Sequence, residues 1–380
     1  MTKFSRERSR LRALLEAMGW AWGMLGLVIR RAIGPRKALV AFSAAGSGTG
    51  WGGDLRSTAM SAALGRMGWE TCVFHPKIGA RTRKLLARLL GVDIVFLQQT
   101  RSRHNDPALY SPVPCVLDVD DADIINPTQT QRIGAVAKGC VGVVAGSRYN
   151  AKLFAPWNST IRVIWTGTYL RQVEGAKPNG QRARVVAWAP SDPFGYPAER
   201  QFIQKVVAAF PANANIEFRI YGVPEARSRE LLDAFAPFDP HGFVRTMPFM
   251  PYSKFVDTLG EVAVGLQPIC AEHEYSLGKS FGKVLAYLAA DVAIVAADAI
   301  DHPLFFKDGV NGRLLPLDAQ AWCDAAMALL DEPARRQEIV NAARASFLAR
   351  LTTEAAAAQL APLLSATLAK KPWPPMPRAT

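Results

Sequence analysis

Short apolar runs alternate with helical stretches over the first half of the chain. The runs that predict buried strands span residues 37–42, 71–74, 93–97, 113–119 and 141–145. Helical periodicity falls between them, over residues 54–67 and 81–90. Because the strands are apolar throughout rather than alternating, they indicate a parallel sheet that helices cover on both faces.

The same alternation restarts after the polar segment 177–181, whose Pro and Gly residues are typical of a linker. The second set of strands spans residues 184–188, 216–221, 262–266 and 292–296, and Gly222 follows one of them. Helices are predicted at residues 198–210, 225–235, 279–290 and 319–330, and within 333–369. We therefore expect two doubly wound α/β domains in tandem, with ligands bound in the cleft beyond the carboxyl ends of the strands.

Composition narrows the class of protein. The 380 residues are 49% hydrophobic and 20% charged, which excludes a disordered chain. No apolar run reaches the roughly 18–20 residues that a spanning helix needs, which argues against a polytopic membrane protein. The five cysteines are scattered and lack a C-x-x-C spacing, so we expect neither a zinc site nor a disulfide framework, and a reducing cytoplasm as compartment.

The positive charge is concentrated at the N-terminal end. Residues 1–37 hold nine Lys and Arg against two Glu, which is +7 of the total +13. Between two basic clusters, residues 17–29 carry no charge and include Trp20 and Trp22. Trp favours the headgroup layer and Lys and Arg favour anionic lipid, so the segment predicts an interfacial helix at the inner face of the cell membrane. An ordinary helix packed on the first domain is the alternative. The charge is local and no recognition motif is present, so nucleic acid is not an expected partner.

A glycine-rich segment at residues 46–53 lies between a predicted strand and a predicted helix. It lacks both the acidic residue of a dinucleotide fingerprint and the Gly-Lys-Ser/Thr of a P-loop. Its glycines let backbone N–H groups and a helix N-terminus approach an anion or a sugar. A long turn is the other interpretation.

Three carboxylates end the apolar strand 113–119, and we take Asp118, Asp120 and Asp121 as candidate catalytic residues. At the carboxyl end of a strand they suit hydrogen bonding to sugar hydroxyls, or stabilising a developing cation. An ordinary strand exit remains open. A metal site is a third interpretation, but the motif alone lacks further ligands.

The segment 272–287 is the richest in polar side chains. If a helix begins near residue 279, Lys279 and Lys283 share a face and Ser280 caps the first turn. Two ammonium groups and free N–H groups at a helix start bind a diphosphate. A solvated basic face is the alternative.

Taken in order, these segments resemble one branch of the GT-B glycosyltransferases of the family 4 type, over roughly residues 38–345. Lys279-Ser-x-x-Lys283-x-x-Ala-Tyr287 resembles the K-S-x-x-K-x-x-E-Y segment of that branch. Residues 117–121 resemble its y-D-x-D-D segment, and Gly52-Gly53 resembles its Gly-Gly pair before a helix.

The resemblance implies two facing Rossmann-like domains with a cleft between them. The expected parts are a basic membrane-surface segment at 1–37, an acceptor domain at 38–175, a nucleotide-sugar donor domain at 182–345, and a helix crossing back with a Pro-rich tail at 346–380.

The resemblance also implies an activity: transfer of a sugar from a nucleotide-sugar co-substrate, with retention, and without a cofactor or a metal. With the basic N-terminal segment, we expect a lipid-linked or cell-envelope glycan acceptor, as in polysaccharide or lipopolysaccharide biosynthesis. The donor-binding residues that follow are Gly52, Gly53, Gly222, Glu274, Lys279, Ser280, Lys283 and Tyr287.

The chain departs from the family at two glutamates. Gly278 stands in place of the first and Ala286 in place of the second, which usually holds the ribose; Glu272 and Glu274 are nearby replacements without the expected spacing. A second hypothesis follows: a catalytically degenerate GT-B protein that acts as a sugar-binding or scaffolding partner in the same pathway.

Overall fold

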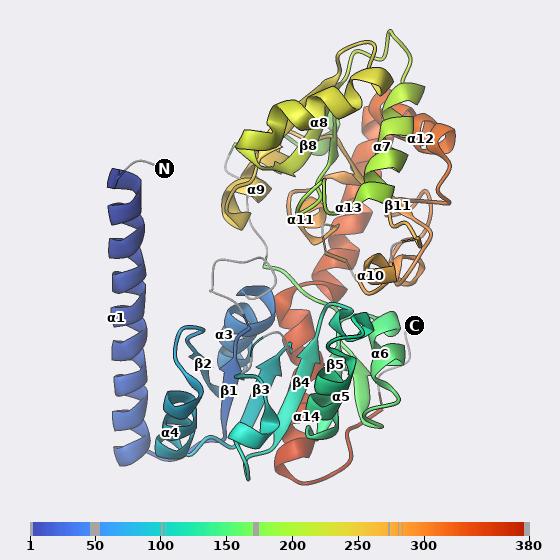
Figure 1. The fold of residues 1–380 in the computed structure, drawn as a ribbon. Coiled ribbons are helices and arrows are strands. Elements are labelled where there is room, and N and C mark those ends of the chain that lie inside the picture. Colours follow the sequence, from blue (N-terminus) through green and yellow to red (C-terminus); the bar gives the residue numbers. More distant parts are fainter. Residues whose placement is uncertain are drawn as a thin grey trace.

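Two parallel six-stranded sheets, one in each half of the chain, form the framework of the computed structural model (Figure 1). The structure describes residues 3–45, 54–99, 102, 104–169, 175–272, 274–279, 281–282 and 284–375; no side chain is described within 3–17 or at 54. The first sheet has the order β2-β1-β3-β4-β5-β6 and the second the order β12-β11-β10-β7-β8-β9. The predicted pair of doubly wound α/β domains is therefore confirmed.

The strands are short. They are β1 Leu39–Ser43, β2 Glu70–Phe74, β3 Ile94–Gln98, β4 Cys115–Val119, β5 Gly142–Ala145, β6 Ile161–Val163, β7 Val185–Trp188, β8 Glu217–Val223, β9 Val244–Pro248, β10 Val264–Gln267, β11 Ala293–Ala297 and β12 Arg313–Leu315. Central strands such as β4 and β11 are buried at every residue, which explains their continuous apolar sequence. The edge strands β6, β9 and β12 were not predicted, because each is partly exposed and mixes polar with apolar residues.

The helices of the first half are α1 Lys3–Ile33, α3 Ala59–Arg66, α4 Ala80–Leu90, α5 Thr130–Lys138 and α6 Arg148–Phe154; a π-helical turn, Asp54–Thr58, precedes α3. Those of the second half are α7 Pro197–Ala209, α8 Ser228–Phe235, α9 Tyr252–Leu259, α10 Glu274–Leu277, α11 Val284–Ala289, α12 Ala319–Asp331, α13 Pro333–Arg350 and α14 Thr353–Leu368. Each sheet buries apolar residues on both of its faces.

The last helix belongs to the first domain. Leu360 and Leu364 of α14 pack in one apolar cluster with Val40 and Phe42 of β1. In Figure 1, α13 lies with the second domain and α14 runs behind the first sheet. The chain thus crosses between the domains twice, and Thr168 of the first crossing donates its N–H to Leu351 O on the second, at 3.0 Å.

Helix α1 lies along the outer side of the first domain (Figure 1). Met24 and Leu27 are buried against the domain, and Trp20 Nε1 donates to Val73 O at 2.8 Å. Arg31, 6% exposed, donates to Leu90 O at 2.5 Å and pairs with Glu70. Within the described ranges, none of the helices combines the length and the apolar character needed to cross a bilayer.

The helix predicted over residues 279–290 is wrong in its first part. α10 ends at Leu277 and α11 begins at Val284, so Lys279 lies in the connection between them. Gly278 and Gly282 flank this stretch, and glycine disfavours a helix interior because it loses the most backbone freedom on folding.

Burial of His302 makes stability depend on pH. Its Nδ1 lies 3.0 Å from Ala297 O and its Nε2 has no partner in the described structure. Burial lowers the pKa of His302 from 6.5 to about 4, because the charged ring is excluded from water. Between these values the unfolded chain binds the proton and the folded chain does not, so stability falls as the pH falls.

We predict that this group removes about 3 kcal/mol of the unfolding free energy between pH 7 and pH 4. His302→Asn keeps a donor for Ala297 O and does not titrate. Urea unfolding of both proteins across this range should therefore show wild type losing stability faster. Parallel stability curves for the two proteins would show that His302 does not titrate as its burial demands.

Candidate functional site

A pocket of about 200 Å³ lies between the two domains, at the carboxyl ends of β4, β7 and β10. Its wall includes Asp120, Asp121, Trp188, Tyr196, Gln267 and Lys279. We call it the cleft pocket. β7 and β10 are adjacent in the second sheet although they are distant in sequence, so the pocket lies at the switch point where doubly wound sheets bind ligands.

Asp118 is not part of the pocket wall. Its side chain is 1% exposed and paired with Arg56, which comes from the π-helical turn before α3. Arg56 Nε lies 2.8 Å from Asp118 Oδ2, and Nη1 donates to Thr166 Oγ1 at 2.8 Å. Burial alone would lower the pKa of the Arg56 guanidinium. The negative charges of Asp118 and Asp120 have the larger effect, so the pKa is raised. In this structure Asp118 therefore binds Arg56 beneath the pocket and does not line the space that a ligand would occupy.

Asp120 does line the pocket, and contacts with Thr166 and Arg56 hold its carboxylate in position. Its Oδ1 accepts a hydrogen bond from Thr166 Oγ1 at 2.7 Å and lies 3.7 Å from Arg56 Nη1. A Cβ on Gly146 would lie 2.4 Å from this oxygen, so the glycine lets the carboxylate sit against the backbone. Asp120 is held in one place without a ligand, as a preorganised group must be.

Asp121 and Lys279 meet across the cleft. Lys279 Nζ lies 2.6 Å from Asp121 Oδ1 and 4.7 Å from the centre of the Tyr275 ring. Burial alone lowers the pKa of Lys279, but the charge of Asp121 more than compensates and raises it. The second domain therefore presents a protonated amine, and the first domain a carboxylate, to the same pocket.

The domains also touch where the resemblance places a glutamate. Ser147 Oγ and Asn150 Nδ2 both donate to Gly278 O, at 3.2 and 3.0 Å. A Cβ on Gly278 would lie 2.5 Å from the Cβ of Ala122, so no longer side chain fits in this arrangement. A glycine at this position thus allows close contact between the domains.

Further hydrogen bonds support this domain contact. Asp301 Oδ2 accepts from Trp165 Nε1 at 2.7 Å and from Arg148 N at 3.0 Å. Glu274, predicted to bind the donor, instead accepts from Tyr149 OH at 2.7 Å and is not part of the pocket wall. Its contact is with the opposite domain.

The other predicted donor residues fall in different places. Tyr287 is fully buried, donates to Ala187 O at 3.1 Å and packs under Gly265, so its role is in the core rather than at the donor. Gly222 has a φ of +75°, and a Cβ there would lie 2.4 Å from Pro190 O beside the cleft. The predicted residues that lie outside the described ranges are Gly52, Gly53, Ser280 and Lys283.

Sequence reasoning missed Arg56 and Glu199. Arg56 gave no local signal, because its carboxylate partner is 62 positions away. Glu199 did give one: it lies on the same face of α7 as Phe202, Ile203 and Val206, all buried. An acidic residue on the apolar face of a helix is seldom buried without a reason.

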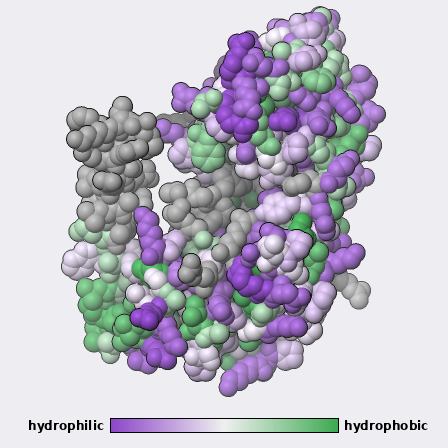
Figure 2. Space-filling model, viewed as in Figure 1, coloured by the Kyte–Doolittle hydropathy of each residue, from purple (hydrophilic) through white to green (hydrophobic). Residues whose placement is uncertain are grey.

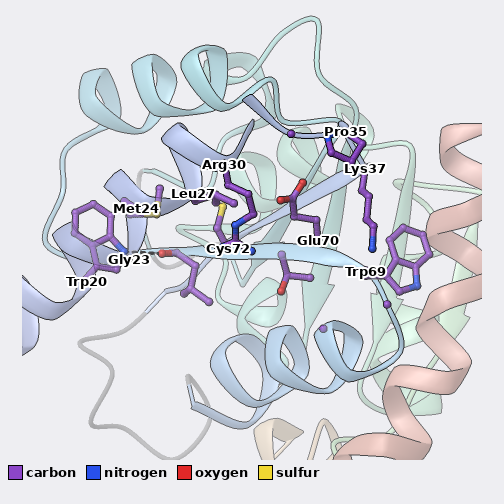
Figure 3. A pocket seen from close by; sticks show the side chains of 15 residues that line it. Trp20, Gly23, Met24, Leu27, Arg30, Pro35, Lys37, Trp69, Glu70 and Cys72 are labelled. Atoms are coloured by element: carbon purple, nitrogen blue, oxygen red, sulfur yellow. Dashed lines mark hydrogen bonds between the residues drawn. The ribbon is translucent and has the colours of Figure 1, made fainter. Parts of the chain in front are cut away.

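A larger pocket, of about 670 Å³, lies under α1 and is a poorer candidate (Figure 3). Trp20, Met24 and Leu27 of α1 face Cys72 of β2 and the neighbouring Trp69. This pocket runs along the outer edge strand of the first sheet. The cleft pocket lies where parallel α/β sheets bind ligands, so we take it as the site.

Comparisons with known proteins indicate the class of protein. Residues 200–361 match a family model described as glycosyl transferase-like. No curated protein matches the sequence. The match covers most of the second domain and reaches into α14, and it supports a transferase enzyme.

Solved structures share the fold of nearly the whole chain. A glycosyltransferase from Rickettsia africae has a TM-score of 0.67 at 12% identity, over 88% of this chain and 99% of its own. Sucrose-phosphate synthase from Thermosynechococcus elongatus has a TM-score of 0.66 at 14% identity, over 88% of this chain and 100% of its own. HepE from Anabaena, solved with UDP and glucose, has a TM-score of 0.65 at 14% identity, over 87% of this chain and 100% of its own. These likenesses establish the GT-B fold.

We predict that Asp118→Ala destabilises the protein by about 3 kcal/mol, because it leaves the Arg56 guanidinium buried without its main partner. The double variant Arg56→Met/Asp118→Leu removes both charges and should regain most of that loss. Urea unfolding measures both. Equal losses in the two variants would show that packing, and not charge pairing, sets the cost.

Proposed function

We propose that this chain is a glycosyltransferase that moves a sugar from a nucleotide-sugar donor to an acceptor bound in the cleft. The observation that carries the proposal is the pairing of Lys279 with Asp121 across a pocket at the switch point of the second sheet. The glycosyl transferase-like match and the GT-B fold support the same reaction class.

The chemistry requires a cation on one side of the pocket. When the bond between the sugar and the diphosphate breaks, the leaving diphosphate gains negative charge. Lys279 is protonated and partly exposed, so it is placed to stabilise this charge. Asp120 and Asp121 face the same space and can accept hydrogen bonds from sugar hydroxyls or stabilise positive charge at the anomeric carbon. In this proposal transfer proceeds with retention and without a metal.

We further propose that α1 holds the enzyme on an anionic membrane surface. Met18, Trp22, Leu25, Ile29 and Ile33 are 49%, 69%, 48%, 51% and 84% exposed. At about 100° per residue they share one face of the helix, roughly opposite the buried face of Met24 and Leu27. An ordinary packed helix exposes no such stripe, so this face supports the membrane rather than the packed-helix interpretation.

The surface next to these exposed residues of α1 is also apolar and carries positive charges. Leu85 and Leu89 of the neighbouring α4 are 56% and 61% exposed. Figure 2 shows hydrophobic residues gathered over the lower part of α1, beside α4. The exposed Arg30, Arg36 and Arg88 lie on the same two helices or just after α1. Apolar side chains among cations suit anionic lipid. We therefore propose a lipid-linked or cell-envelope glycan acceptor at the cytoplasmic face of the membrane.

Replacing Lys279 tests the enzymatic proposal. We predict that Lys279→Met lowers kcat/KM for release of UDP from UDP-glucose by about 100-fold or more, since a single preorganised group of this kind contributes that much. Lys254→Met, which removes an exposed lysine on α9, should leave the rate unchanged. Wild-type rates in Lys279→Met would contradict the proposal.

The alternative function, a degenerate scaffold, has a different signature. UDP, GDP, ADP and their glucose conjugates should raise the Tm of an enzyme, because a ligand that binds only the folded state stabilises it. If none of these ligands raises the Tm and no nucleotide is released from the conjugates, the chain is the sugar-binding or scaffolding protein instead.

Replacing the exposed stripe tests the membrane proposal. We predict that Trp22→Ser/Ile29→Ser weakens sedimentation with phosphatidylglycerol vesicles at least tenfold, because each lost side chain removes on the order of 1–2 kcal/mol of apolar burial. Val310→Ser/Leu317→Ser, on the second domain, is the matched control. Equal loss in both pairs, or none in the first, would count against α1 as the docking element.

A further inference from the structure

Glu199 has a carboxylate oxygen that nothing in the described structure satisfies. The residue lies in the first turn of α7, is 3% exposed and lines the cleft pocket. Its Oε1 accepts a long hydrogen bond from Cys270 N, at 3.3 Å. Its Oε2 is buried and has no hydrogen-bond partner among the described residues. The carboxylate of a residue that lines the pocket therefore has unused acceptor capacity.

Such an arrangement is costly for stability alone. A buried polar atom without a partner forfeits the hydrogen bonds that it makes with water in the unfolded chain. The neighbours of Glu199 on the buried face of α7 are Phe202, Ile203 and Val206, so an apolar side chain would suit this position better. Because Glu199 also lines the cleft pocket, a ligand of that pocket is a source of the missing hydrogen bonds.

The pocket has two chemically different sides. Lys279 supplies positive charge where the first domain meets the second. Glu199, when ionised, only accepts hydrogen bonds, and it repels a phosphate. The groups that satisfy it are hydroxyls, which a nucleotide sugar carries on its ribose and on its hexose. A diphosphate on Lys279 and a hydroxylated ring toward Glu199 match both sides at once.

We propose that Glu199 accepts hydrogen bonds from sugar hydroxyls of the donor, a specificity contact that rests on the proposed function. The two positions at which the resemblance places glutamates are occupied by Gly278, pressed against the first domain, and by Ala286, fully buried. Glu199 supplies a carboxylate to the same cleft from a different helix.

The test compares wild type with Glu199→Gln, which keeps the size of the side chain and removes its charge. Calorimetry gives the Kd of UDP-glucose, UDP and 2′-deoxy-UDP for each protein. We expect UDP-glucose to bind Glu199→Gln about 10- to 100-fold more weakly, the range for a lost hydrogen bond to a charged group. Glu225→Gln, at an exposed glutamate of the same domain, should bind like wild type.

The three ligands separate the two kinds of hydroxyl. If Glu199 contacts the hexose, UDP binds both proteins equally and only UDP-glucose is weakened. If it contacts the ribose, UDP and UDP-glucose weaken together, and the loss shrinks for 2′-deoxy-UDP. Unchanged affinity for all three ligands overturns the inference and leaves the proposed function standing. Wild type that binds none of the three overturns both the uridine donor and the inference.

A stability measurement distinguishes a ligand contact from a structural role. Glu199→Leu removes the unpaired oxygen and adds apolar volume on the buried face of α7. We expect its Tm to equal or exceed that of wild type while UDP-glucose binding is lost. A lower Tm together with unchanged affinity would show that Glu199 serves the packing of α7 and would overturn the proposal.

Discussion

The buried ion pair between Arg56 and Asp118 is the interaction on which the cleft depends. A guanidinium taken out of water is tolerable only beside a carboxylate that stays ionised. Arg56 comes from the turn before α3, Asp118 from the last part of β4, and Thr166 from the segment after β6, so the pair ties three segments together under the pocket. Thr166 links the ion pair to the pocket wall, because its hydroxyl accepts a hydrogen bond from Arg56 and donates one to Asp120. Charge burial in one domain thus sets the position of a group that faces the other.

The second constraint is the close approach of the domains at Gly278. Without a Cβ, its carbonyl reaches both Ser147 and Asn150, and Ala122 packs where a side chain would begin. The glycine at this position is therefore part of a domain contact. Asp301, which accepts hydrogen bonds from two groups of the first domain, strengthens the same contact. Together these bonds fix the width of the cleft pocket.

Local patterns predicted the fold well because most central strands, such as β1, β3, β4 and β11, are buried along their whole length and the helices have apolar faces. They predicted the site less well because its contacts join distant segments. The carboxylates at the end of β4 and just after it were found by position, but only the structure shows that Asp118 pairs with the buried Arg56 while Asp120 lines the pocket. Tyr287 was misassigned because a motif position says nothing about burial. The sequence shows Glu199 as an acidic residue on an apolar helix face, but only the structure shows that this residue lines the cleft pocket.

Exposure separates the two ion pairs of the cleft into a permanent one and an exchangeable one. The side chains of Arg56 and Asp118 are 3% and 1% exposed, whereas those of Lys279 and Asp121 are 28% and 15% exposed. A diphosphate cannot reach the first pair, but it can compete with Asp121 for Lys279, because it brings more negative charge to the same amine. In the proposed reaction, this exchange would leave the Asp121 carboxylate beside the sugar ring of the donor, where it can stabilise positive charge at the anomeric carbon. Glu199 differs from both pairs, because one of its oxygens has no described partner to exchange. In the proposed function, the hydroxyl groups of a bound donor would supply the hydrogen bonds that Glu199 Oε2 does not receive from the described residues.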